Sequence, residues 1–252
     1  MLTEIDKMGA YEAFECIILE LKMITLITFP PTFGEPSASS FCTKAMYLLN
    51  MAGVEWQRHD TNDPRKWPKA KLPAITVDGR TIGDSNRIRV YLETLGVDLE
   101  PGLSDLDKST AVSIIRMAEE HMYFHVVMDR WGNDDVWPIV RDVYFKDIPK
   151  LPRLIITKGL RKQLMKGMHA QGLGRWTPQE RMERLEPDLQ AITQRLWHGP
   201  YLFGAVPSAA DASVAPVLAS MRSTPKPTAL RRRIEDDKVL SGYIDRVATA
   251  LG

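Results

Sequence analysis

The amino-acid sequence predicts a two-part protein, with a mixed α/β unit near the N-terminus followed by an all-helical unit. Short β-prone runs, each bounded by turn residues, occur only before residue 96. After residue 105 the apolar residues recur at helical spacing, and no strand pattern is found. A chain of 252 residues is long enough for two modest domains with a substantial core.

Turn-rich stretches give the predicted limits of these parts. Residues 97–104, which include a Pro-Gly pair, form a linker between an α/β unit of residues 23–96 and a helical unit of residues 105–252. Residues 1–22 precede the first strand pattern, and their acidic residues are wrong for a secretory signal. They are predicted to be an N-terminal extension outside the fold.

The α/β unit shows alternating strand and helix patterns. Strands are predicted for residues 24–29, 54–59, 74–77 and 80–82, and helices for residues 41–52 and 85–95. Asp63-Pro64 starts a short helical turn before the third strand. Asp78-Gly79 tolerates the positive φ of a type I′ turn, so the last two strands form a hairpin. The order β-α-β-α-β-β-α predicts a parallel pair from the first two strands and an antiparallel pair from the hairpin.

Capping patterns mark the helices of the second unit. One long amphipathic helix is predicted from residue 105 to about residue 131. Thr177-Pro178-Gln179-Glu180 is a capping box with proline at the first helical position, and Pro187 should kink the helix that follows. Ser208 and Asp211 predict a second reciprocal cap, and a last helix is predicted at the C-terminus.

The composition argues against several classes of function. Lys plus Arg (33) nearly balance Asp plus Glu (32). Counterion release would therefore contribute little to binding a nucleic acid, and no nucleic acid partner is expected. The basic run Arg231-Arg232-Arg233 is followed by Glu235-Asp236-Asp237, which predicts a solvated face neutralised by its own acids. No apolar run reaches the length of a membrane span, so no membrane partner is expected. The two cysteines, Cys16 and Cys42, predict a reducing, cytoplasmic compartment.

Three short segments carry residue types from which a binding site can be built. Leu72-Pro73-Ala74 puts a proline immediately before a predicted strand. Asp84-Ser85 and Ser39-Ser40 each put side-chain oxygens at the predicted N-terminus of a helix, where free backbone N–H groups and the helix dipole favour an anion. Taken singly, the three segments are explained as a loop proline and two helix N-caps. A functional interpretation depends on their occurring together.

Together these segments resemble the N-terminal domain of the glutathione transferases. The run KLPAITVDGRTIGDSNRIRVYLE is similar to that family's proline–strand–hairpin–helix element, and YLFGAVPSAADASVAPVL is similar to the capping motif of its helical domain. The resemblance extends from about Met23 to the C-terminus. It implies the glutathione transferase fold, in which an α/β thioredoxin-like domain precedes an all-α domain. RMAEEHMYFHVVMDRW and QGLGRWTPQE are similar to the failed-axon-connections and metaxin-type branch, and the N-terminal part also resembles bacterial β-etherase transferases.

The resemblance implies a glutathione site, with glutathione as cosubstrate. The residues that match the family's site are Lys71, Leu72, Pro73, Asp84 and Ser85. In the family the proline follows a cis peptide bond, and the residue before it pairs with the cysteinyl backbone of glutathione. The acidic residue and the serine hold the γ-glutamyl end. Ser208 and Asp211 match a structural pair.

Thiol activation is the mechanism that the family implies. Ser39 matches the position of the catalytic serine or cysteine, and the helix N-terminus behind it would lower the pKa of a bound thiol. The next residue is Ser40 where the family has proline, and Ser37 lies close by, so the choice among the three serines stays open. Cys42 takes the second cysteine position of a Cys-x-x-Cys motif whose first cysteine is absent. It is therefore interpreted as a buried helix residue.

The second substrate would be an electrophilic small molecule, which the sequence does not identify. The residues of the long helix predicted to line its pocket are Met117, His121 and Phe124. His121 and His125 lie four residues apart, a spacing that can bind zinc, but the sequence offers no third ligand and no metal is expected. Glu119 and Glu120 are interpreted as polar-face residues.

Two functions of different classes follow from the sequence. The first is a glutathione-dependent transferase that activates the glutathione thiol for attack on an electrophile. The alternative is a non-catalytic binding or scaffold module of the failed-axon-connections or metaxin type. Transferases of this fold commonly form dimers across the two domain types, so a twofold homodimer is expected.

Overall fold

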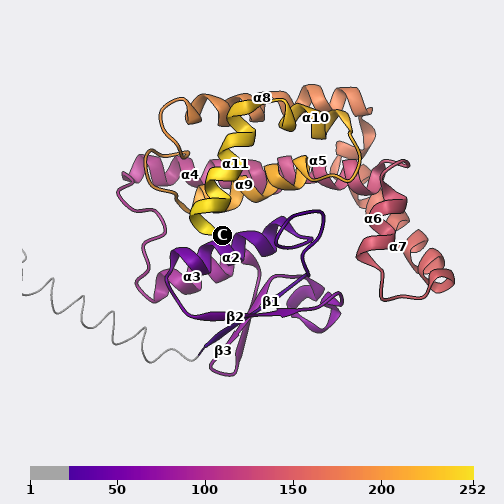
Figure 1. Ribbon diagram of the computed structural model, residues 1–252, viewed down its shortest axis with the longest axis horizontal. Helices are drawn as coiled ribbons and strands as arrows, with labels where there is room; N and C mark the ends of the chain where they lie inside the picture. Colours follow the sequence, from indigo (N-terminus) through magenta and orange to yellow (C-terminus); the bar gives the residue numbers. More distant parts are fainter. Residues whose placement is uncertain (1–22) are drawn as a thin grey trace, which may run out of the picture.

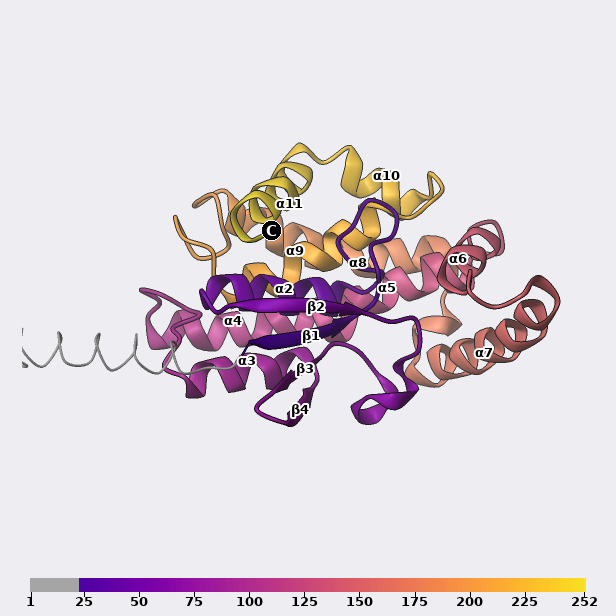
Figure 2. The ribbon, with the colours of Figure 1, turned by 60° about the horizontal axis from the view of Figure 1, so that its bottom comes forward.

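The computed structural model describes residues 23–252, and its N-terminal unit contains a four-stranded sheet (Figures 1 and 2). Its strands, in the spatial order β2-β1-β3-β4, are β1 (Ile24–Thr28), β2 (Trp56–Asp60), β3 (Ala74–Val77) and β4 (Arg80–Gly83). β1 and β2 are parallel, whereas β3 is antiparallel to both β1 and β4. The predicted parallel pair and hairpin are both confirmed. The predicted extension, residues 1–22, lies outside the described residues.

The connections of the sheet follow the local turn chemistry. Asp78 and Gly79 have φ of 49° and 71°, the positive values that a type I′ turn requires. The predicted helical turn before β3 is present as two 3-10 turns, Pro64–Lys66 and Pro68–Ala70. The carboxylate of Asp63 caps the first of these turns by accepting a hydrogen bond from the backbone N–H of Arg65 at 3.1 Å. The two longer helices of this unit are α2 (Ser40–Met51) and α3 (Ser85–Thr94).

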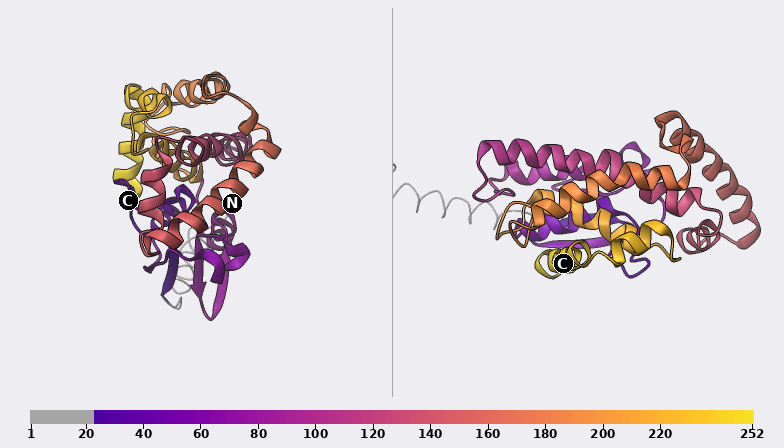
Figure 3. Two further views of the ribbon diagram at one scale, coloured as in Figure 1. Left: turned by 90° about the vertical axis from the view of Figure 1, so that its right-hand side faces the viewer. Right: turned by 90° about the horizontal axis from the view of Figure 1, so that it is seen from above.

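The rest of the described chain is helical. Its α-helices are α4 (Asp105–Met117), α5 (Tyr123–Val127), α6 (Trp137–Tyr144), α7 (Lys150–Gln171), α8 (Pro178–Leu196), α9 (Ala209–Arg222), α10 (Ala229–Glu235) and α11 (Lys238–Leu251). Two π-helical segments, Ala118–Met122 and Met128–Gly132, continue α4 and α5, so the predicted long helix is present with two local widenings. α6 and α7 extend from one end of the unit (Figures 1 and 3).

Helix α9 lies at the centre of the core. Every residue from Ala209 to Met221 is buried, and the helix packs against α2, α4 and α11. Figure 2 shows α2 between the sheet and α9. Side chains of both units, for example Leu48 of α2 and Leu218 of α9, belong to one continuous apolar cluster. This shared core fixes α2 against the helical unit.

The second predicted reciprocal cap is confirmed at the start of α9. The buried Asp211 carboxylate accepts hydrogen bonds from the backbone N–H and the hydroxyl of Ser208, at 2.8 Å and 2.9 Å. Its other oxygen accepts from the backbone N–H of Leu202 and from the Tyr243 hydroxyl, both at 2.9 Å. The capping box of Thr177 and Glu180 at α8 is also present.

The basic run of α10 is only partly neutralised by its own acids. Arg231 pairs with Glu235, and Arg233 with Asp237, both at 2.8 Å. Arg233 also pairs with Glu186 of α8 at 2.8 Å, so the run joins two helices. The predicted domain limits stay predictions, because the structure itself shows only that α3 ends at Thr94 and α4 begins at Asp105.

Candidate glutathione site

The three segments of the predicted site lie against one another. The side chains of Cys42, Leu72 and Ala74 belong to one apolar cluster, which places the first turn of α2 against the segment that precedes β3. The backbone N–H of Asp84 donates to the carbonyl oxygen of Pro73 at 3.0 Å, which ties the start of α3 to the same segment. Residues far apart in the sequence are thus brought to one place, as the resemblance implies.

Ser39 occupies the N-cap position of α2 with a hydroxyl that caps nothing. Its backbone is extended, with φ −121° and ψ 124°, and its side chain makes no capping hydrogen bond. Its carbonyl oxygen accepts from the backbone N–H groups of Cys42 and Thr43, at 3.0 Å and 3.1 Å, and so begins the helix. The residue is half-buried. A hydroxyl placed there can donate to an anionic atom at the positive end of the helix.

The two neighbouring serines are placed differently. Ser37 is buried, and its hydroxyl donates to the Phe29 carbonyl at 2.9 Å and accepts from the Ser39 N–H at 3.3 Å. Ser40 is also buried, and its Oγ has no hydrogen-bond partner among the described residues. Ser37 therefore holds the loop, whereas the hydroxyl of the half-buried Ser39 makes no capping hydrogen bond. This arrangement supports Ser39 as the thiol's partner, although the assignment stays a prediction.

The peptide bond between Leu72 and Pro73 is cis, as the resemblance implies. The Leu72 side chain is buried, but the sheet pairing of β3 begins at Ala74. None of the backbone hydrogen bonds in the described loops and caps involves Leu72. Its N–H and carbonyl groups are therefore not used by the sheet or by these loops. Lys71 is exposed beside it.

Asp84 is an N-cap of α3, and it has two further features. Its Oδ1 accepts from the backbone N–H groups of Asn86 and Arg87, at 2.9 Å and 3.3 Å. Its φ is 85°, a value that costs about 1–3 kcal/mol for a non-glycine residue and that clusters at functional sites. The hydroxyl of the buried Ser85 takes part in none of the hydrogen bonds among the described residues. An acidic oxygen and a free hydroxyl thus remain at a helix N-terminus.

A buried polar network beneath this site was missed by the sequence analysis. Lys44 of α2 forms an ion pair with Glu119, and its ammonium donates to the side-chain oxygen of Asn86 at 2.6 Å. The Asn86 amide donates to the other Glu119 oxygen at 2.8 Å. The interpretation of Glu119 as a polar-face residue was wrong, because its side chain is buried against the α/β unit, whereas Glu120 is exposed. The network joins α2, α3 and the long helix.

Aromatic side chains of the helical unit lie next to the first turn of α2. The rings of Phe41 and Tyr123 are 4.7 Å apart at 68°, an edge-to-face contact. The Tyr144 hydroxyl donates to the carbonyl of Ala38 at 3.4 Å, and Arg130 donates to that hydroxyl at 2.8 Å. Burial raises the pKa of Tyr123 to about 12, so its hydroxyl stays protonated at neutral pH. The sequence offered no signal for these contacts.

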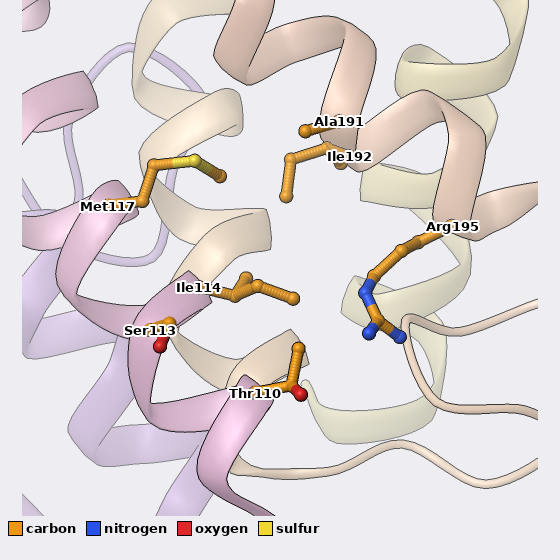
Figure 4. Close-up of a pocket in the computed structure, with 7 residues that line it drawn as sticks. All are labelled: Thr110, Ser113, Ile114, Met117, Ala191, Ile192 and Arg195. Carbon is orange, nitrogen blue, oxygen red and sulfur yellow. The ribbon is translucent and has the colours of Figure 1, made fainter. Parts of the chain in front are cut away.

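The residues predicted for the second substrate lie on another part of the long helix. Met117 lines a pocket of about 170 Å³ between α4 and α8, together with Ile114, Ile192 and Arg195 (Figure 4). No predicted glutathione residue lines this pocket. His121 Nδ1 is 2.5 Å from Asp188 Oδ2 of α8. Phe124 packs in a cluster with Val127 and Met168. The assignment of Met117, His121 and Phe124 to an electrophile stays a prediction.

The two histidines of the long helix contact each other. The rings of His121 and His125 are 5.1 Å apart, and burial lowers the pKa of His125 to about 3. Among residues 23–252 there is no group of three or more His, Cys, Asp or Glu side chains arranged to hold a metal ion.

Cys42 is a buried residue of α2, as predicted. Burial raises the pKa of its thiol, so the side chain is protonated at neutral pH and unreactive.

The fold and the site define a two-domain protein with a thioredoxin-like first domain and a helical second domain. The family model of the glutathione S-transferase N-terminal domain matches residues 40–137, and that of the C-terminal domain matches residues 178–246. The chain therefore belongs to the glutathione S-transferase superfamily.

Relatives of known name fall into two groups. An isoprene-epoxide–glutathione S-transferase from Rhodococcus sp. (strain AD45) is 27% identical, over 89% of this chain and 98% of that protein. Failed axon connections from Drosophila melanogaster is 26% identical over 90% of this chain, which spans 58% of that protein. Human metaxin-2 is 24% identical over 58% of this chain and 56% of that protein. The resemblance to the metaxin-like branch is thus confirmed.

Solved structures of glutathione transferases share the fold. One from Phanerochaete chrysosporium has a TM-score of 0.62 at 17% identity, covering 91% of this chain and 97% of that chain. Poplar glutathione transferase F1 has a TM-score of 0.55 at 15% identity, with coverages of 90% and 92%. The predicted glutathione transferase fold is confirmed.

Proposed function

We propose that this protein is a transferase that binds glutathione and activates its thiol for attack on an electrophilic small molecule. The observation that carries the proposal is the Ser39 hydroxyl, which makes no capping hydrogen bond at the N-terminus of α2 and lies beside the segments of Leu72 and Asp84. The similarity to a bacterial transferase over nearly its whole length supports the same activity.

Glutathione would lie extended across the three segments. Its cysteinyl backbone would pair with the free N–H and carbonyl groups of Leu72, next to Pro73. Its γ-glutamyl ammonium would meet the Asp84 carboxylate, and the adjoining carboxylate would meet the Ser85 hydroxyl and the N-terminus of α3. The exposed Lys71 would attract a carboxylate of the tripeptide.

Ser39 would stabilise the thiolate form of the bound cosubstrate. A free thiol of this kind titrates near pH 8.5, so it is mostly protonated at neutral pH. A donated hydrogen bond and the positive helix end favour the thiolate and lower that pKa. The thiolate then forms a carbon–sulfur bond while the bond from that carbon to the leaving atom breaks. Where the electrophile is an epoxide, the leaving atom is the ring oxygen, which takes a proton from solvent and becomes a hydroxyl.

Epoxides are the first electrophiles to test, because the Rhodococcus relative is named for one. The protein is expected to form a glutathione conjugate of isoprene epoxide faster than the uncatalysed reaction, as measured by mass spectrometry of the product. A rate equal to that without protein, for isoprene epoxide and for aryl halides alike, would contradict the transferase proposal.

A non-catalytic binding module is the second candidate. It is favoured by the similarity to failed axon connections and metaxin-2, neither of which is named as a transferase. Retention on immobilised glutathione with elution by free glutathione, but with no turnover of any electrophile, is the result expected for such a module.

Ser85→Ala is expected to weaken glutathione binding by about 1–3 kcal/mol, the usual range for a lost buried or charged hydrogen bond. Isothermal titration calorimetry measures this affinity. The matched control is Ser113→Ala in α4, an exposed serine outside the site, which should leave the affinity unchanged. Equal glutathione affinities for the two variants would indicate that Asp84 and Ser85 serve only as a helix cap.

The protein is proposed to be a cytoplasmic homodimer without a nucleic acid partner. None of the helices in residues 23–252 is long and apolar enough to cross a membrane. Static light scattering at micromolar concentration is expected to give twice the chain mass of 28.5 kDa. A single species at the chain mass would contradict the dimer.

A further inference from the structure

Helix α7 differs in charge from the rest of the chain. Its 22 residues contain six Lys or Arg and no Asp or Glu. The other residues hold the remaining 27 Lys plus Arg and all 32 Asp plus Glu, a formal net charge of −5, whereas the whole chain carries +1. The net positive charge of the whole chain therefore depends on this one helix.

The lysines and the arginines of α7 have different surroundings. Arg161 donates to the Trp131 carbonyl at 2.6 Å and so holds the helix to the body, whereas Arg153 donates to the Ile148 carbonyl at 2.9 Å in the segment between α6 and α7. Among residues 23–252, these two arginines are the residues of α7 that form ion pairs. The lysines are exposed. Their ammonium groups are thus available to an anionic partner.

Apolar side chains continue the line of lysines at the N-terminal end of the helix. The basic–apolar row consists of Leu151, Ile155, Lys158, Lys162 and Lys166. Spacings of four, three, four and four residues keep the row on one face of the helix. Leu151 and Ile155 are 75% and 76% exposed, whereas Thr157 and Met168, on the face toward the body, are buried. Figures 1 and 3 show α7 extending from the end of the helical unit.

We infer that the basic–apolar row of α7 docks on an anionic lipid surface. The lysines meet the negative headgroups, and Leu151 and Ile155 enter the boundary between the headgroups and the acyl chains. A lipid boundary accepts such side chains without a matching groove, whereas an acidic protein would have to supply one. The charge complementarity and the protruding, straight row therefore favour a membrane over an acidic protein.

This contact is peripheral and differs from the membrane span that the sequence analysis considered. The expectation of no membrane partner was based on the lack of an apolar run of spanning length, and a surface contact requires no such run. The inference is independent of glutathione chemistry, because no residue of the row belongs to the candidate site. Its failure would leave the proposed transferase activity untouched.

Cosedimentation of the full-length protein with sucrose-loaded vesicles tests the inference. The protein should pellet with vesicles of mixed phosphatidylcholine and phosphatidylserine at low salt, and should stay in solution with phosphatidylcholine alone. Lys158→Gln/Lys162→Gln/Lys166→Gln should weaken this binding by about tenfold or more, since each lysine near an anionic surface contributes separately. Leu151→Ser/Ile155→Ser should weaken it as well. Circular dichroism should show that both variants keep the helix content of the parent.

Matched variants separate the row from general charge and apolarity. Lys108→Gln/Lys226→Gln/Lys238→Gln removes the same charge from exposed lysines elsewhere, and should leave vesicle binding within about twofold. Leu106→Ser/Val206→Ser removes two exposed apolar side chains outside α7, with the same expectation.

Four results would overturn the inference. The first is that the parent protein does not pellet with anionic vesicles. The second is that the row variants and their matched controls lose vesicle binding equally. The third is binding to poly-glutamate but not to vesicles, which would indicate an acidic protein partner. The fourth is that Leu151→Ser/Ile155→Ser converts a dimer to a monomer, which would indicate that the row binds a second copy of this chain.

Discussion

Lys44→Met is expected to lower the free energy of unfolding by about 3–5 kcal/mol, the cost of leaving a buried charge without its partner. Lys44 is 1% exposed, and its ammonium contacts Glu119 and Asn86 in the interior. Methionine keeps the unbranched apolar stem, so the variant removes mainly the charge. The Glu119 carboxylate then stays buried with only the Asn86 amide as a donor. Unfolding by urea, followed by circular dichroism, measures the loss.

An exposed ion pair of the same long helix provides the control. Arg116 and Glu120 are 3.5 Å apart with side chains 60% and 63% exposed, so Arg116→Met should change the stability by less than about 1 kcal/mol. Lys44→Met/Glu119→Leu removes both buried charges and should recover much of the loss of the single variant. Equal, small effects of Lys44→Met and Arg116→Met would show that the buried pair contributes no more than a surface pair.

The parts of the fold that were predicted correctly depend on interactions between neighbours in the sequence. The Asp78-Gly79 turn, the capping box of Thr177 and Glu180 and the cap of Ser208 and Asp211 each need only two to four consecutive residues. The long helix was predicted because apolar periodicity persists through its π segments. Even so, α6 and α7 were not assigned, because α7 has few buried positions to create a periodic pattern.

The site was predictable in its segments but not in its supporting contacts. Leu72-Pro73 and Asp84-Ser85 were found through family resemblance, because a loop proline and an N-cap have no distinctive pattern of their own. Glu119 contacts a lysine 75 positions away, a separation that no local pattern reports. The sequence did contain one indication that Glu119 is buried. Glu119 lies four residues after Ile115 and three before Met122, both buried, so helical spacing placed it on the apolar face.

The pocket prediction illustrates the same limit. Met117, His121 and Phe124 were chosen for their position along the long helix, and their orientation was unknown from the sequence. In the structure Met117 lines the pocket between α4 and α8 and His121 contacts α8, whereas Tyr123 faces Phe41 of α2. Which face of a helix meets which neighbour is decided by packing between distant segments, and a single sequence does not contain that information.

Ser39→Ala is expected to raise the pKa of the bound glutathione thiol by about 1–2 units, because one hydrogen bond to a charged group is worth about 1.5–3 kcal/mol. At neutral pH the thiolate fraction and the turnover should fall by up to about 10–100-fold, the full factor applying where the pH is below the pKa of the thiol bound to the parent protein. The loss should shrink as the pH rises through the raised pKa, since the thiolate then forms without the hydroxyl. Glutathione affinity should change little, because Leu72 and Asp84 still hold the tripeptide. The thiolate absorbance of bound glutathione, followed against pH, measures the shift.

The structure decides which serine is the proper control for Ser39. Ser40→Ala removes a buried hydroxyl that makes no hydrogen bond, so it should leave the titration where it is in the parent protein. Ser37→Ala is unsuitable, because it breaks the bonds to Phe29 and Ser39 that hold the loop. Ser39→Ala itself removes no capping hydrogen bond, so α2 should remain intact and a slower turnover would report on the thiol alone. If Ser40→Ala shifts the pKa of the bound thiol and Ser39→Ala does not, Ser40 is the residue that meets the thiol. If neither variant shifts the titration while glutathione still binds, the thiol is not activated here and the protein is a binding module.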